Sequence, residues 1–159
     1  LLSSVRLARL RKAARESSDQ DQLRALTARM RRSGVLREAG AMRVSLVWAH
    51  PHAGLSLWAA HPGLGLTRPA DLWPELGIEA FDVEDLEERP YQLEVRRNAR
   101  DLATTVEAQL VVVWNEGQSD ERIMIMPLEF SGDRQSYRFS ITGRELAQVQ
   151  EAAAAEEVE

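Results

Sequence analysis

Residues 42–60 read MRVSLVWAHPHAGLSLWAA, two apolar segments joined by a link that contains proline and glycine. Apolar side chains occupy every second position of both segments: Val44, Leu46 and Trp48 in the first, and Leu55, Leu57 and Ala59 in the second. Alternation with a period of two is typical of strands that bury one face. The stretch therefore predicts two strands that contribute to a common core.

Five further runs of the same kind follow, separated by clusters of Gly, Pro, Asn or Asp. They cover residues 78–83, 91–97, 104–115, 121–130 and 134–142. Seven short β-rich runs in about 100 residues, with no strongly periodic helix among them, are typical of an antiparallel β-sandwich. We predict a mostly β protein, in which an Ig-like sandwich of about seven strands over residues 42–142 follows an N-terminal helical hairpin arm.

Two of these runs are apolar on both faces. Residues 110–114 predict a central strand, and the run from Ile123 to Met126 stops at Pro127, which indicates an edge strand or a bulge. The second apolar face of these strands needs cover from the arm or from another subunit. We expect the methionines to point outward, and the candidate interface consists of Val111, Val113, Met124 and Met126.

Residues 1–41 form a basic arm that predicts two helices and can be the end of a helical-repeat region. Residues 1–43 carry eleven basic and four acidic side chains, a net charge of +7, whereas the whole chain has a net charge of −5. Ser18 is the expected N-cap of the second helix. The arginines can form a solvated face, dock onto an acidic protein surface, or bind nucleic acid or anionic lipid. The arm has no aromatic residue, which disfavours single-stranded nucleic acid.

Residues 143–159 predict an acidic, helix-prone tail, because Ala and Glu favour helices. The chain has no cysteine, which excludes disulfides and thiolate metal sites. No run approaches the ~20 apolar residues of a membrane helix, so we expect no direct membrane insertion. The expected partners are other protein subunits, in a homo- or hetero-oligomer, and not nucleic acid.

Three histidines lie within twelve positions and are the candidate metal ligands: His50, His52 and His61. Three imidazoles can bind zinc or copper, but no carboxylate lies between Trp48 and Arg68 to support them, which favours ordinary loop histidines. The carboxylates between residues 82 and 88 are expected to be solvated. No activated-serine motif or phosphate-binding loop is present, so we predict neither an enzyme nor a cofactor.

The runs VSLVWAHPHAGLSLWAAHPG, GIEAFDVEDLEERPYQLEVRRN and TTVEAQLVVVWNEG resemble the YfaP-like bacterial β-sandwich domain of unknown function, over about residues 42–115. The matching landmarks are Trp48, the strand from Leu55 to Leu57, Pro62-Gly63, Glu79 to Phe81, Pro90-Tyr91 and Thr105-Val106. The family pattern has two aspartates and a histidine where this chain has Gly54, Ser56 and Trp58. The resemblance therefore implies a purely structural copy, in an envelope or secreted protein.

The expected function is a non-enzymatic interaction or structural module of a larger bacterial assembly, in the periplasm or cell envelope rather than the cytoplasm. The alternative is a β-sandwich that binds a glycan or a peptide in an aromatic groove at Trp58 and Trp73. The same two rings can instead cover an open end of the sandwich.

Overall fold

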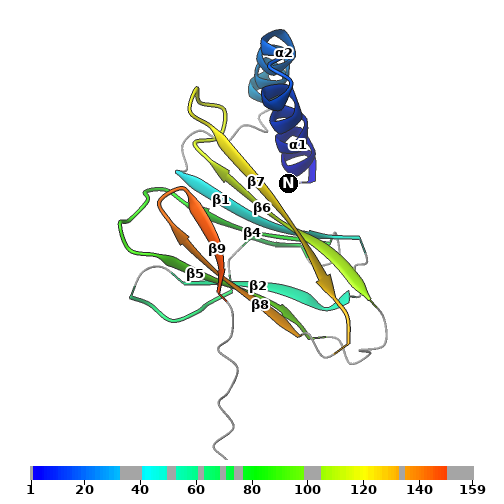
Figure 1. The fold of residues 1–159 in the computed structure, drawn as a ribbon, viewed down its shortest axis with the longest axis vertical. Coiled ribbons are helices and arrows are strands. Elements are labelled where there is room, and N and C mark those ends of the chain that lie inside the picture. Colours follow the sequence, from blue (N-terminus) through cyan, green and yellow to red (C-terminus); the bar gives the residue numbers. More distant parts are fainter. Residues whose placement is uncertain are drawn as a thin grey trace, which may run out of the picture.

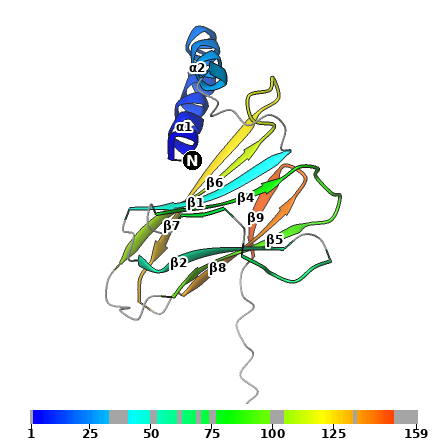
Figure 2. The same ribbon diagram turned by 180° about the vertical axis from the view of Figure 1, so that it is seen from behind.

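The computed structural model describes residues 2–32, 41–49, 53–60, 63–68, 71–73, 77–98, 105–132 and 135–149. The fold is mostly β, with two antiparallel sheets that face each other and two helices on the outer side of the larger sheet (Figure 1 and Figure 2). The larger sheet has the strand order β3-β4-β1-β6-β7, and the smaller sheet has the order β2-β5-β8-β9.

The helices and strands of the described residues have the following bounds: α1 Leu2–Glu16, α2 Gln20–Arg32, β1 Met42–Trp48, β2 Leu55–Ala60, β3 Asp71–Trp73, β4 Ile78–Val83, β5 Tyr91–Arg97, β6 Val106–Trp114, β7 Arg122–Phe130, β8 Ser136–Thr142 and β9 Glu145–Val149.

Each of the seven predicted runs contains a strand, and two strands come in addition. β3 extends the larger sheet, and β9 extends the smaller one. The strand β9 corrects the prediction of a helix-prone tail from residue 143. The chain reverses at Gly143, which has a φ of 56°, and β9 then pairs with β8. Leu146 packs against the core, and this contact outweighs the local helix propensity. The rest of the predicted tail, residues 150–159, lies outside the described residues.

The core lies between the two sheets, and the alternating positions of the sequence supply it. The buried cluster includes the three apolar side chains of β1 and the three of β2 that the alternation selects. Full burial of such a side chain contributes ~1.5–3 kcal/mol. Trp114 is the largest fully buried side chain of the described residues, and its indole N–H donates to the Gly143 carbonyl at 3.0 Å. This bond joins the end of β6 to the turn before β9.

Tyr91 organises the acidic turn between β4 and β5. Its hydroxyl accepts the Glu87 N–H at 3.2 Å and donates to the Asp85 carbonyl at 3.0 Å. The Tyr91 side chain is buried, so these two bonds anchor the backbone of the turn to the core. Four of the five carboxylates that were expected to be solvated are exposed: Glu84, Asp85, Glu87 and Glu88. The expectation is wrong for Asp82 of β4, which is half-buried because it pairs with Arg43 at 2.8 Å.

β2 is an edge strand, and groups from outside its own sheet form hydrogen bonds with backbone groups along its outer edge. Ala59 and Thr67 exchange two backbone hydrogen bonds of 2.8 Å. Two residues earlier, the Leu57 N–H donates to the Glu79 carboxylate at 2.6 Å. Glu79 belongs to β4 of the larger sheet, is completely buried, and also pairs with Arg68. A side chain of one sheet therefore satisfies a backbone donor of the other.

Gly77 precedes β4 and lies against the end of β1. Its carbonyl accepts the Trp48 N–H at 2.9 Å, and its φ is 67°, in the left-handed region that favours glycine. A Cβ atom at this position would collide with the Trp48 carbonyl oxygen. The close approach of these two strand ends therefore requires glycine.

Gly77→Ala should lower the free energy of unfolding by ~2–4 kcal/mol, because the methyl group adds a collision with the backbone to the cost of a positive φ. Gly143→Ala is the matched control, since Gly143 has a φ of 56° with no atom within 4 Å of the added Cβ. It should cost only ~1 kcal/mol. Urea unfolding followed by tryptophan fluorescence measures both, and equal losses would contradict the close approach at Gly77.

Candidate functional site

The two helices of the arm form a hairpin with a tight connection at Ser18. Ser18 has a φ of 57°, its N–H donates to the Arg15 carbonyl at 3.1 Å, and the Asp19 N–H donates to the Ala14 carbonyl at 2.9 Å. This Schellman arrangement ends α1. Asp19 then caps α2, because its Oδ1 accepts the Gln22 N–H at 2.9 Å. The prediction of Ser18 as the N-cap is therefore wrong by one residue, since its left-handed backbone ends the first helix.

α1 lies against the outer face of the larger sheet, and α2 lies farther from the sheets (Figure 1). Ala8 of α1 is buried in one cluster with Ile78, Val111, Val113 and Ile123. The small side chain of Ala8 allows the helix to approach the strands closely. The arm therefore provides the cover that the second apolar face of β6 and β7 needs.

Met124 and Met126 do not lie on this outer face. In the register of β6 and β7, Met124 is opposite Val112 and Met126 is opposite Leu110, and both methionines pack against the core between the sheets. The expectation that they point outward is wrong, because Ile and Met alternate there with no polar residue to distinguish the faces. The other two members of the predicted interface are buried under α1. β7 is an edge strand, as Pro127 indicated.

Six charged side chains join the arm to the sandwich, and we call them the ionic cluster: Arg11, Arg15, Arg43, Asp82, Glu116 and Glu121. Arg11 is at the centre, and its side chain and that of Glu121 both have an exposed fraction of 0%. Arg11 pairs with Glu121 and lies 3.3 Å from the Glu116 carboxylate. It also donates to the Met30 sulfur of α2, so one guanidinium connects both helices to the sandwich.

Arg15 and Arg43 complete the ionic cluster. Arg15 lies 3.2 Å from the second carboxylate oxygen of Glu121. Arg43 of β1 lies 2.8 Å from Glu116 and 2.8 Å from Asp82. Three arginines thus face three carboxylates, which is the balance that buried charges require.

Part of the positive charge of the arm is therefore used inside the molecule. From the sequence, these arginines could form a solvated face or dock onto an acidic surface. In the structure, Arg11 and Arg15 dock onto carboxylates of the sandwich of the same chain. Their carboxylate partners, Glu116 and Glu121, lie in the loop between β6 and β7 and were not among the predicted site residues. The signal that could have found them is the density of carboxylates in this loop, together with two arginines one helical turn apart.

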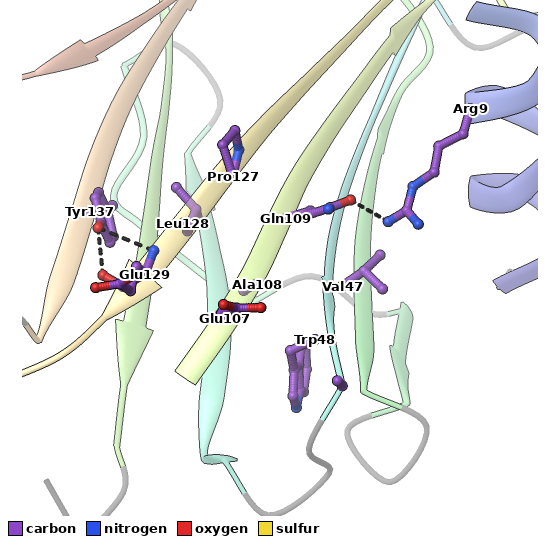
Figure 3. A pocket seen from close by; sticks show the side chains of 11 residues that line it. Arg9, Val47, Trp48, Glu107, Ala108, Gln109, Pro127, Leu128, Glu129 and Tyr137 are labelled. Atoms are coloured by element: carbon purple, nitrogen blue, oxygen red, sulfur yellow. Dashed lines mark hydrogen bonds between the residues drawn. The ribbon is translucent and has the colours of Figure 1, made fainter. Parts of the chain in front are cut away.

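A groove of about 670 Å³ lies beside α1 on the outer face of the larger sheet (Figure 3). Arg9 of α1 forms one side, and its guanidinium donates to the Gln109 side-chain oxygen on β6. Val47 of β1 and Pro127 of β7 provide apolar walls. The arm and the sandwich thus build this groove together, and we call it the arm groove.

Glu107 of β6 and Glu129 of β7 line the arm groove away from Arg9 (Figure 3). They are directly opposite each other in the strand register, and both are exposed. Neither forms an ion pair within the described residues, although Ser131 donates to the Glu129 carboxylate at 3.2 Å. Two side chains of like charge that face each other across a strand pair destabilise it. Two unneutralised carboxylates beside an apolar wall suit an arginine or lysine, whose stem is apolar and whose head is cationic.

Trp58 lies on the outer face of the smaller sheet among polar and charged side chains. The Arg96 guanidinium lies 4.4 Å from the centre of its ring, and the indole N–H donates to the Ser56 hydroxyl at 3.1 Å. Glu94 is 5% exposed and lies 2.9 Å from Arg96 and 3.6 Å from Arg138. The hydrogen bond from Arg96 lowers the pKa of Glu94 against the opposing effect of burial, and the charges of Arg96 and Arg138 lower it further.

The predicted aromatic groove is not assembled among the described side chains. Trp58 belongs to the smaller sheet and Trp73 to β3 of the larger one, and the Trp73 side chain lies outside the described part of the molecule. The three candidate metal ligands, His50, His52 and His61, also lie outside the described residues. Within those residues, no group of three or more His, Asp or Glu side chains could hold a metal ion.

In the part of the chain that the structure describes, no helix has the length and apolar character to cross a membrane. Comparisons with family models, curated proteins and solved structures find no match to this chain. The geometry of the arm, its ionic cluster and the arm groove is therefore the basis for inferring a function.

Arg11→Met should lower the free energy of unfolding by ~2–4 kcal/mol, because removing one partner of a buried pair leaves the carboxylates undercompensated, although Arg15 still pairs with Glu121. Arg24→Met is the matched control, since its side chain is 79% exposed. It should change stability by less than ~0.5 kcal/mol. Urea unfolding measures both, and hydrogen exchange should show faster opening of α1 in Arg11→Met alone. Equal effects would show that the ionic cluster does not hold the arm.

Acidification should remove the contribution of Glu94 to stability. Its pKa in the folded state lies below the usual value of 4.5, so the contribution is complete above that value and is lost as the pH falls through the lowered pKa. Glu94→Gln should destabilise the protein at neutral pH and flatten the fall of stability below about pH 4.5. Urea unfolding across this range measures the effect, with the exposed Glu145→Gln as control. Parallel profiles for wild type and Glu94→Gln would refute it.

Proposed function

We propose that this protein is a non-enzymatic interaction module of a larger bacterial assembly, and that the arm groove receives a segment of a partner subunit. The observation that carries the proposal is the pair Glu107 and Glu129 beside the apolar walls of the groove, two exposed carboxylates that no cation of the described residues neutralises. A partner segment that places an arginine or lysine between them would remove their repulsion and bury its stem against Pro127.

The rigidity of the arm supports this proposal. The fully buried Arg11 and Glu121 hold α1 against the sandwich, and Arg9 of the same helix is tied to Gln109. Both walls of the arm groove are therefore formed before a partner arrives. A preformed site avoids much of the entropic cost of ordering a loop or a side chain on binding.

Two features support an Ig-like, YfaP-like assignment of the sandwich within this proposal. The neighbours β3-β4-β1 in one sheet and β2-β5 in the other follow the arrangement of the central strands of Ig domains. The Tyr91 hydroxyl bonds back to the turn before β5, which resembles the tyrosine corner of such domains. An envelope location rests only on the resemblance of the sequence to that family.

Charge reversal in the arm groove tests the function. We expect the chain, purified from its native host at moderate salt, to be part of a discrete complex of stoichiometric composition. Glu107→Lys should weaken this complex at least tenfold, about 1.4 kcal/mol, because the groove would then repel the cation of the partner. Glu145→Lys is the matched control, since it reverses an exposed strand carboxylate of the other sheet. Light scattering and subunit quantification provide the readout.

A chain that is purified alone and remains monomeric would contradict an assembly function. A complex that Glu107→Lys and Glu145→Lys affect equally would contradict the arm groove as the binding surface. The unfolding curve of Glu145→Lys should match that of the wild type, because this side chain is exposed. Glu107→Lys should be at least as stable as the wild type, because it replaces the repulsion of Glu129 by an attraction.

A further inference from the structure

A second groove, of about 490 Å³, lies between α2 and the loop that connects β6 to β7, and we call it the basic groove. Arginines and uncharged polar side chains line much of it: Arg15, Arg24, Arg31, Gln20, Thr27, Gln118 and Ser119. Arg15 is already part of the ionic cluster. Arg24 is 79% exposed and lies 3.9 Å from Asp21, which is 97% exposed, so this pair neutralises its charge only weakly. Arg31 is exposed and forms no ion pair within the described residues.

The complementary charge lies on the turn between β4 and β5, which we call the acidic turn. Its four exposed carboxylates are Glu84, Asp85, Glu87 and Glu88. Arg89 follows them and leaves the turn with a negative net charge. The two hydrogen bonds of Tyr91 hold its backbone, so the turn loses little conformational freedom on binding. An anchored turn with several carboxylates has the chemistry that suits a groove lined by guanidinium groups, because the two groups form charge-assisted hydrogen bonds.

The acidic turn of a chain does not reach the basic groove of the same chain. Both views of the ribbon show the turn between β4 and β5 apart from α2 (Figure 1 and Figure 2). The carboxylates of the turn form no ion pair with Arg24 or Arg31 in the described residues. Each molecule therefore presents a basic groove and an exposed acidic turn, whose charges do not pair with each other within the described residues.

We infer that the acidic turn of one copy docks into the basic groove of a second copy, so that the chain associates with itself from head to tail. The contact uses two different surfaces, and such a contact can repeat until a ring closes or a filament grows. This inference rests on the proposed role in assembly and names a second copy as one partner. It uses none of the residues of the arm groove, so the two proposals can fail independently.

Two variants separate the surfaces. Arg24→Glu with Arg31→Glu reverses the charge of the basic groove without touching the ionic cluster, and Glu87→Lys with Glu88→Lys reverses the acidic turn. Sedimentation of the wild-type chain from about 10 µM to about 1 mM should show growing particles, and raising the salt from about 0.05 M to about 0.5 M should weaken them. Each variant alone should associate at least tenfold more weakly. An equimolar mixture of the two should recover association, because the intact turn of one variant meets the intact groove of the other and the two reversed surfaces also carry opposite charges.

The control is the double variant Arg6→Glu with Glu145→Lys, which keeps the net charge and reverses two exposed residues outside both surfaces. It should associate like the wild type. A wild-type chain that remains monomeric up to about 1 mM at low salt would overturn the inference. The same holds if either groove or turn variant associates as the wild type does, or if their mixture stays monomeric. If self-association is absent while the partner complex still responds to Glu107→Lys, the proposed function stands and the head-to-tail contact does not.

Discussion

A guanidinium that is completely removed from water is stable only if carboxylates lie at fixed positions around it. Arg11 is such a group, and the fold must supply these carboxylates. Its partners come from the loop between β6 and β7 and from α2, so its position determines how the hairpin lies on the sandwich. The same rotation of α1 directs Ala8 to the sheet and Arg9 to the groove. Apolar contact with Ala8 alone would define this orientation poorly, because a methyl group packs acceptably in many rotations.

The sequence predicts much of the sandwich because a period of two is a direct consequence of strand geometry. The seven runs contain strands, and Pro127 correctly indicates an edge. The same reasoning fails where polar residues are missing: Met124 and Met126 alternate with isoleucines, and hydrophobicity does not show which face is buried. It also fails at β9, because Ala and Glu favour a helix locally while Leu146 packs on the core.

The sequence contains the signals for the groups of the ionic cluster, but it does not give their pairing, for a different reason. Arg11 and Glu121 are separated by 110 positions, and a charge run carries no signal of the residue that it will meet. The net charges of the arm and of the remainder do indicate attraction between them. They do not show which arginines are buried, since Arg11 lies on α1, which packs on the sandwich, whereas the exposed Arg24 lies on α2. Apart from Arg15, the charged side chains that line the two grooves form no ion pair between the arm and the sandwich in the described residues, and they therefore remain at the surface.

The bond between the Glu79 carboxylate and the Leu57 N–H has a mechanical consequence for the sandwich. Two sheets held only by apolar side chains can shift against each other with a small loss of contact, because dispersion is weakly directional. The hydrogen bond of 2.6 Å from the Leu57 N–H of β2 to the Glu79 carboxylate of β4 is directional and opposes such sliding. The sheets should therefore resist shear as one body, so that a force applied through the arm on the larger sheet is passed on to the smaller one.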